Sequence, residues 1–177
     1  MTLLPLAGRA RVLGDDVDTD TIIASRRKKE TLDPAVLRSF LLEAHDPHFA
    51  KSVCAGDILV AGSNFGCGSA MEVAVTVVLG AGIRAVVARS FSRTYLRNAM
   101  NNGLLAVVAD TARIAEGDTI ELALDGHGRL QLHCRAAGKP LDPACICACE
   151  PIAPFMLEML ECGGLVPYLR ARGGFPG

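Results

Sequence analysis

The residues best suited to chemistry lie in a glycine-rich stretch, residues 57–72, which reads DILVAGSNFGCGSAME. Its glycines allow the backbone to turn sharply or to approach a ligand closely. Ser69 follows the last of them, and Glu72 stands three residues later, which is the spacing of a capping box at a helix start. Because a helix start offers unpaired N–H groups and the positive end of the helix dipole, the stretch predicts a site for an anionic ligand.

Two interpretations of Ser69 fit this local pattern. The stretch is neither a P-loop, which needs Lys-Ser or Lys-Thr after the last glycine, nor a G-x-G-x-x-G dinucleotide fingerprint. In the simpler interpretation Ser69 caps a helix and the glycines shape a turn, and the local pattern favours this because serine is a preferred capping residue. In the other interpretation Ser69 is a catalytic hydroxyl at the start of that helix.

An acidic segment, DDVDTD at residues 15–20, precedes this stretch. It is not a calcium loop, because Thr21 stands where such a loop needs glycine and Arg27 where it needs a bidentate glutamate. Two interpretations remain. The segment is a solvated turn whose aspartates accept backbone N–H groups, or one aspartate points into a site and orients a base or a hydroxyl.

The densest positive charge is the run Arg26-Arg27-Lys28-Lys29. Such a run is usually a solvated face, but a mobile loop that meets carboxylates is the alternative. Because residues 25–32 combine these cations with no apolar anchor, we expect a flexible loop that is not ordered without a partner.

Short apolar runs and helical stretches alternate around these segments. Strand and helix alternate with short links from residue 58 to residue 108, which predicts a parallel sheet with helices packed on it. Two alternating runs around residues 125–128, Asp-Gly-His-Gly, predict a β-hairpin. We expect strands at residues 9–13, 58–61, 85–88, 104–108, 119–124 and 129–133, and helices from residue 33 to before Asp46, at 70–79, at 92–102 and at 155–160.

Composition limits the classes of protein. The 177 residues suit one domain, 1–177, with a C-terminal appendage from about residue 140. A net charge of −1 and a pI near 6.4 leave no footprint for nucleic acid or a membrane surface, and no apolar run approaches the ~20 residues that span a bilayer. Seven cysteines, an odd number, fit a reducing compartment, and the N-terminus does not read as a secretory signal. We therefore expect a cytoplasmic protein.

Three of the cysteines, Cys145, Cys147 and Cys149, are spaced C-x-C-x-C. Cluster and zinc sites usually space their ligands as C-x₂-C, so the pattern favours small apolar residues in an extended segment over a metal site.

Five separated segments stand out together along the chain: GDDVDTDTII, AGDILVAGSNFGCGS, LGAGIRAVVARSF, YLRNAMNNGL and ECGGLVPYL. In this order they resemble the small subunit of the aconitase family, with the small subunits of isopropylmalate isomerase (3-isopropylmalate dehydratase) and homoaconitase as nearest kin. The resemblance covers the chain from about Gly8 to Leu169. The resemblance implies an α/β fold, a swivelling β/β/α domain with a mostly parallel sheet, flanking helices and a hairpin. It also implies that the domain works only beside a large subunit.

The same resemblance implies the chemistry. The large subunit of the family carries a 4Fe–4S cluster on its own cysteines, so we expect no metal or cofactor on this chain. Ser69 corresponds to the family's serine base, which takes a proton from the carbon beside a carboxylate, and Asp20 corresponds to an aspartate that orients groups around it. The basic run matches, by position only, the loop where the family places substrate-discriminating residues. Beside the catalytic pair, the candidate substrate-binding residues are Gly68, Ala70, Met71, Arg26, Arg27 and Lys28.

One departure bears on the substrate. The family usually reads G-S-S-R-E where this chain reads G-S-A-M-E at residues 68–72. The second serine, a hydrogen-bond donor, is Ala70 here, and the arginine that contacts a substrate carboxylate is Met71. Losing such a carboxylate partner should cost about 2–4 kcal/mol of transition-state binding. Met71 then suggests an apolar substituent on the substrate, or a carboxylate held instead by Arg26 or Arg27.

We therefore expect the small subunit of an iron–sulfur hydro-lyase and isomerase of the 3-isopropylmalate dehydratase type. Its substrate would be isopropylmalate or a related alkylmalate, with a dimethylmalate, citramalate or homoaconitate-type acid as competitors. The alternative is a non-catalytic paralogue that binds a large subunit as a structural or regulatory partner. A homo-oligomer of the isolated chain is left open.

Overall fold

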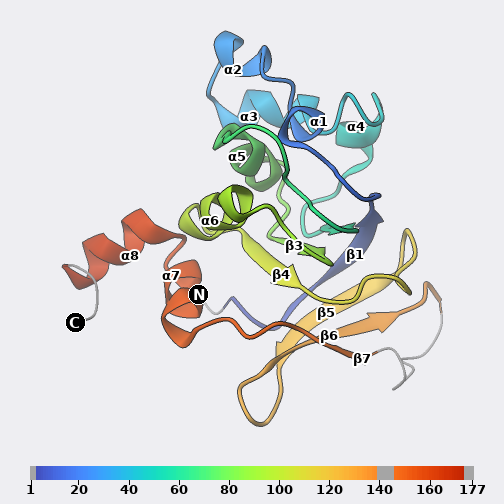
Figure 1. Ribbon diagram of the computed structural model, residues 1–177, viewed down its shortest axis with the longest axis vertical. Coiled ribbons are helices and arrows are strands. Elements are labelled where there is room, and N and C mark those ends of the chain that lie inside the picture. Colours follow the sequence, from blue (N-terminus) through green and yellow to red (C-terminus); the bar gives the residue numbers. More distant parts are fainter. Residues whose placement is uncertain (1–2, 139–145, 174–177) are drawn as a thin grey trace.

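The computed structural model describes residues 3–138 and 146–173, and its centre is one mixed sheet of seven strands in the order β4-β3-β2-β1-β5-β6-β7 (Figure 1). Neighbours among the first four strands are parallel, and β1 pairs antiparallel with β5, whose successors are also antiparallel. The strands are β1 (Leu6–Val12), β2 (Ile58–Ala61), β3 (Ala85–Ala88), β4 (Leu105–Val108), β5 (Thr119–Leu124), β6 (Leu130–Arg135) and β7 (Ile146–Ala148).

The sheet curls so far that its two edges meet. Ala109, just after β4, forms an antiparallel bridge with Cys149, just after β7. The Glu150 N–H also donates to the Val108 carbonyl at 2.9 Å. The C-terminal segment therefore closes the sheet and covers edge N–H groups that would otherwise invite pairing with another chain.

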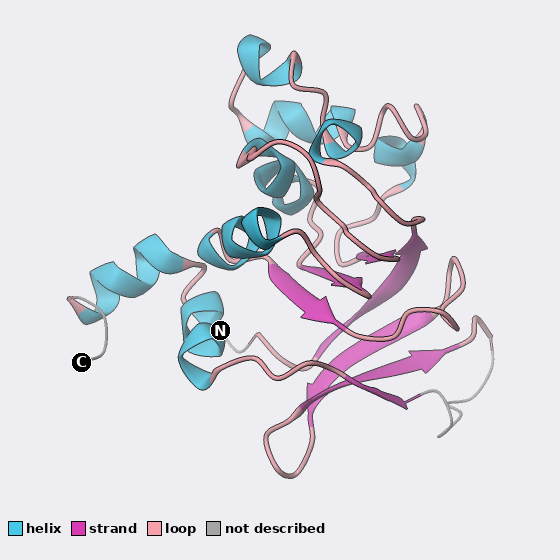
Figure 2. Ribbon diagram, viewed as in Figure 1, coloured by secondary structure: helices cyan, strands magenta, loops and turns pink. Residues whose placement is uncertain are grey.

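Helices cover the parallel half of the sheet, while β5, β6 and β7 form the opposite end (Figure 2). Helices α6, α7 and α8 pack on one another, and α5 contacts α1, α3 and α6. No helix among the described residues is long and apolar enough to cross a membrane. The helices are α1 (Thr19–Ile22), α2 (Arg27–Glu30), α3 (Pro34–Leu37), α4 (Phe49–Ser52), α5 (Val73–Gly80), α6 (Arg93–Asn101), α7 (Pro154–Glu161) and α8 (Leu165–Arg172).

The core lies between the parallel strands and α5. All four residues of β2 and all four of β3 are buried, as expected for parallel strands covered on both faces. Helix α5 is apolar nearly all round and is largely buried in this layer. The predicted α/β class with a hairpin is confirmed. The sheet is not mostly parallel as predicted, because three of the six strand pairings among the described residues are parallel and three are antiparallel.

One predicted helix is shorter in the structure, and one helix near the C-terminus was not predicted. The one that starts after Asp33 ends early: α3 passes into a single 3₁₀ turn, Arg38–Phe40, and Leu42 then adopts a left-handed φ of 55° while its N–H bonds the Ile22 carbonyl. The helix predicted at residues 155–160 corresponds to α7, but a further helix, α8, follows the two glycines and was not predicted. Gly164, with φ 113°, passes so close to the Asn101 carbonyl oxygen that a Cβ would lie 2.4 Å from it.

Candidate functional site

The site is built from two loops that leave the carboxyl ends of neighbouring parallel strands, where open α/β sheets commonly bind ligands. Residues 13–18 follow β1 and residues 62–72 follow β2. Backbone hydrogen bonds join the two loops: the Gly66 N–H donates to Val17 O at 2.8 Å and the Thr19 N–H donates to Cys67 O at 2.9 Å. The fold therefore brings the acidic segment against the glycine-rich stretch.

Gly66 shows why this stretch needs a glycine. Its φ is 74°, and a Cβ there would lie 2.2 Å from the Tyr95 ring. Phe65, immediately before it, is fully buried and packs edge-on against the rings of Tyr95 and Phe91. These aromatic contacts fix the base of the loop, from which the chain rises to Ser69.

Ser69 lies exposed on this loop. Its carbonyl oxygen accepts a hydrogen bond from the Thr19 Oγ1 at 3.0 Å, and Thr19 itself is 2% exposed. The backbone around the serine is thus held from below by a buried hydroxyl, while its own side chain faces outward from the fold.

The prediction that Ser69 caps a helix is wrong. Helix α5 begins at Val73, its cap position is Glu72, and no side chain caps it. The helix starts late because Cys67 still pairs as an extended residue with Asp18. As a result, none of the backbone N–H groups of residues 68–73 donates a hydrogen bond within the described chain. The loop still offers donors to an anion, although Ser69 is not at the helix end.

Three of the four aspartates have partners that define the loop. Asp15 accepts the Ser63 N–H at 2.6 Å and pairs with Arg89 at 2.5 Å; these two hydrogen bonds lower its pKa. Asp16 accepts from the Asn64 amide at 2.9 Å, and Asp18 caps α1. Asp15 and Asp18 accept backbone N–H groups, as in the first interpretation.

Asp20 is exposed, as Asp15 and Asp16 are, and its Oδ1 accepts the Ser25 N–H at 2.9 Å. It directly follows Thr19, the residue that holds the Ser69 backbone. Asp20 is therefore the exposed carboxylate of the acidic segment that lies next in sequence to Thr19.

Ala70 and Met71 have opposite environments. Ala70 is exposed, whereas Met71 is 4% exposed and belongs to the hydrophobic core. A side chain packed in the core cannot meet a substrate from where it lies. The structure therefore gives Met71 a packing role, and the hypothesis that it contacts an apolar substituent of the substrate finds no support in this geometry.

The basic run is not an unanchored loop. Arg27 donates to both Glu43 oxygens, at 3.0 and 2.9 Å, and its guanidinium lies 3.7 Å from the centre of the Phe40 ring. The hydrogen bonds from Arg27 hold the pKa of Glu43 below its usual range. The flexibility of residues 25–32 stays a prediction, but Arg27 in this segment is anchored on a ring and a carboxylate of its own chain.

The neighbours of Arg27 remain available. Arg26 is 70% exposed although it pairs with Glu43 at 3.4 Å, and Lys28 is exposed without an ion pair among the described residues. Of the three cations predicted to bind substrate, Arg26 and Lys28 keep the freedom to meet an anion.

The cysteines make no metal centre in the described part of the chain, where no three His, Cys, Asp or Glu side chains gather as a metal would need. Cys147 lies in β7, as the extended interpretation predicted, and Cys145 lies outside the described residues. Burial, together with the charges of Asp18 and Asp16, raises the pKa of the Cys67 thiol. The raised pKa disfavours the reactive thiolate form of Cys67.

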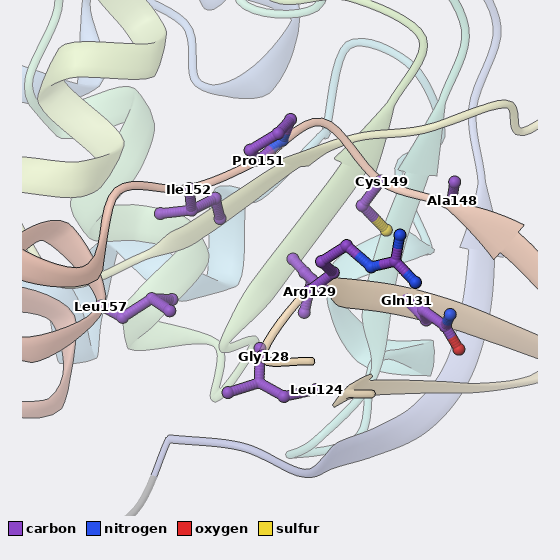
Figure 3. Close-up of a pocket in the computed structure, with 10 residues that line it drawn as sticks. Leu124, Gly128, Arg129, Gln131, Ala148, Cys149, Pro151, Ile152 and Leu157 are labelled. Carbon is purple, nitrogen blue, oxygen red and sulfur yellow. The ribbon is translucent and has the colours of Figure 1, made fainter. Parts of the chain in front are cut away.

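A cavity also lies away from Ser69. A cavity of about 250 Å³ lies between the β5–β6 turn and the segment before α7, with Arg129 and Gln131 at one end and Ile152 and Leu157 at the other (Figure 3). Ser69 does not line it. Because Ser69 lies on an open surface, an enclosed site around it needs a second surface to cover it.

Comparisons with known proteins agree with this architecture. The Aconitase C-terminal domain model matches residues 43–112. The chain is 41% identical over 167 residues to the "Methanogen homoaconitase small subunit" of Methanocaldococcus jannaschii, covering 94% of this chain and 92% of that protein. It is also 41% identical to the "3-isopropylmalate dehydratase small subunit" of Oleidesulfovibrio alaskensis, covering 93% and 94%. The chain belongs to this family of small subunits.

A solved structure supports the assignment. The crystal structure of a 3-isopropylmalate dehydratase from Methanocaldococcus jannaschii superimposes with a TM-score of 0.83 at 39% identity, covering 96% of each chain. The curled sheet and its loops are therefore those of the 3-isopropylmalate dehydratase small-subunit family.

Sequence reasoning missed Thr19. Its hydroxyl touches the Ser69 backbone, 50 positions away in the chain. The one available signal was its place between two aspartates in a segment already singled out, but a threonine in an acidic turn is unremarkable without the fold.

Proposed function

We propose that this chain is the small subunit of a two-subunit hydro-lyase and isomerase of the 3-isopropylmalate dehydratase type. The enzyme would remove water from a substituted malate and add it back at the neighbouring carbon. The observation that carries the proposal is the exposed Ser69, whose carbonyl is hydrogen-bonded to Thr19 of the acidic segment. The relatives that match more than nine-tenths of this chain are such small subunits.

Ser69 is the base in this proposal. Its Oγ takes the proton from the carbon beside a substrate carboxylate, and it needs help because a serine hydroxyl is a poor base at its free pKa. The N–H groups of residues 68–73, which donate no hydrogen bond within the described chain, would supply partial positive charge to stabilise an alkoxide and nearby carboxylate oxygens. The start of α5, one turn further on, adds the positive end of its dipole.

A large subunit completes the site. The open surface around Ser69 needs a cover that excludes water, and the names of the relatives imply such a partner. A 4Fe–4S cluster on that partner would supply the Lewis acid that draws off the substrate hydroxyl. This chain contributes the base, the loop donors and its exposed charges.

Asp20 and the exposed cations would position the substrate. Asp20 directly follows Thr19, whose hydroxyl binds the Ser69 carbonyl, and would orient groups beside Ser69. Arg26 and Lys28 are the exposed cations of the basic run, so they are the candidates for a carboxylate that the missing family arginine no longer holds. Gly68 and Ala70 leave the loop without bulk on its exposed side. This pattern favours an alkylmalate other than the usual family acid, such as a dimethylmalate or citramalate.

A second candidate function rests on Ala70 and Met71. These residues remove a hydroxyl donor and a guanidinium at the family positions, and Met71 is packed in the core. A paralogue that binds a large subunit as a structural or regulatory partner, without turning over substrate, would show this pattern.

The test is reconstitution with the co-expressed large subunit under anaerobic conditions and assay of a panel of 2- and 3-alkylmalates. Ser69→Ala should lower kcat by about 10²–10⁴-fold, the usual contribution of a general base. Ser63→Ala is the matched control, because Ser63 lies on the same loop and its hydroxyl makes no hydrogen bond within the described residues. Unchanged turnover in Ser69→Ala would exclude the catalytic role, and a stable complex that is inactive on every acid would favour the paralogue.

A further inference from the structure

Thr19 is the residue of the acidic segment that binds the loop at residues 62–72. Its hydroxyl donates to the Ser69 carbonyl at 3.0 Å, and its backbone N–H donates to the Cys67 carbonyl at 2.9 Å. Thr19 is 2% exposed, whereas Ser69 and Ala70 are exposed. A buried hydroxyl thus meets the loop from inside the fold at the position of the proposed base.

Holding the Ser69 carbonyl fixes more than that oxygen. The carbonyl and the N–H of Ala70 belong to one planar peptide unit and point in opposite directions. With the carbonyl directed inward to Thr19, the Ala70 N–H points to the exposed side of the loop, where it has no acceptor within the described residues. Since residue 70 carries no hydroxyl, this N–H is the donor that the position can offer.

We propose that Thr19 is a positioning residue for the reaction, acting through the peptide between Ser69 and Ala70. It touches no substrate. Its hydroxyl keeps that peptide in the orientation that turns the Ala70 N–H toward developing negative charge. This inference rests on the proposed role of Ser69 as the base.

The geometry predicts the effect of removing the Thr19 hydroxyl. In Thr19→Val the side-chain shape is kept and the backbone bond to Cys67 remains, so the two loops stay in register. The Ser69 carbonyl loses its buried donor, and because this loop is exposed, the carbonyl can turn outward to water. The same rotation of the peptide unit carries the Ala70 N–H inward. The loop then loses orientation rather than fold.

The experiment uses the reconstituted two-chain enzyme and compares Thr19→Val with Thr19→Ser. We expect Thr19→Val to lower kcat by about 10–100-fold with KM changed less than about threefold, since the lost interaction acts in the transition state. Thr19→Ser, which keeps the hydroxyl, should remain within about threefold of wild type. If Thr19→Val fails to fold, Thr19→Ala against Thr19→Ser provides the same comparison.

Thr111→Val is the matched structural control. Thr111 is also buried, at 8% exposed, and its hydroxyl likewise donates to a backbone carbonyl, that of Ala61, at 2.8 Å. Its loss should lower stability as much as the Thr19 change while leaving kcat unaltered. Equal losses of kcat in Thr111→Val and Thr19→Val would mean that only general destabilisation is being measured, and would overturn the proposal.

A second variant tests the link to Ala70. Ala70→Ser places a hydroxyl donor at the position that lacks one, so Thr19→Val should cost less kcat in that background than in the wild type; equal costs would refute the coupling. Ser69→Ala, run in parallel, separates the two hypotheses. If Ser69→Ala abolishes turnover while Thr19→Val does not, the positioning role alone fails. If Ser69→Ala is fully active, the proposed function fails and the role of Thr19 fails with it.

Discussion

Met71 offers the sharpest test of how this chain differs from its family, because packing and substrate contact predict different outcomes. The side chain is 4% exposed and lies in the hydrophobic core. Met71→Ala removes three heavy atoms from this core, worth about 2.4 kcal/mol at roughly 0.8 kcal/mol each. A residual cavity adds to this, although the adjoining loop can partly collapse into it, so we expect a loss of about 2–4 kcal/mol in the free energy of unfolding.

The measurement is urea unfolding of the isolated small subunit, followed by circular dichroism. Met71→Leu keeps the volume and should cost less than about 1.5 kcal/mol. Leu32→Ala, at a position 69% exposed, should stay within about 0.5 kcal/mol of the wild type. In the reconstituted enzyme, Met71→Leu should leave the preference among alkylmalates unchanged.

A contrary pattern is easily recognised. If Met71→Ala unfolds at the wild-type urea concentration and instead changes KM among the alkylmalates, Met71 contacts substrate and the core assignment is wrong. Met71→Arg, which would restore the family residue, should destabilise the free subunit because a guanidinium replaces a buried thioether.

Asp57→Asn should lower stability by about 2–3 kcal/mol, because Asp57 is buried and accepts from Arg9 at 2.7 Å. Burial opposes the charge of Asp57, but the hydrogen bonds from Arg9 and the Cys54 N–H outweigh it and lower its pKa. The stability that Asp57 contributes is therefore present above its ordinary pKa of 3.8 and is lost as the pH falls through the lowered value, so thermal melts from pH 7 to pH 3 should converge with those of Asp57→Asn. Arg27→Gln should speed amide exchange in residues 27–43 without changing KM, whereas Arg26→Gln should raise KM about tenfold and leave exchange unchanged; the reverse result would show that Arg27, not Arg26, meets the substrate.

Much of the sheet was readable from local pattern. Strands such as β2 and β3 are short apolar runs between turn residues, and their predicted bounds match the structure at every residue. The hairpin followed from its Asp-Gly-His-Gly turn. These features are local, since burial on both faces and tight turns leave a direct imprint on residue type.

The start of α5 was not readable, because Ser69 and Glu72 have the spacing of a capping box that the structure does not use. Pairing of Cys67 with Asp18, far away in the chain, outweighs the local capping preference. The anchoring of Arg27 on Phe40 and Glu43 was missed for the same reason: a cation run reads as solvated until the fold places a ring and a carboxylate beside it.

The amino-acid sequence by itself determined the order of the strands from β1 to β6, the family of the chain and the two loops that carry its candidate chemistry. Only the tertiary structure decided which groups in those loops are free to act. It placed Ser69 and Asp20 outside, Met71 inside, and the Thr19 hydroxyl beneath the serine. Burial and hydrogen-bond partners depend on which distant segments meet, and that information is spread over the whole chain rather than held in any one motif.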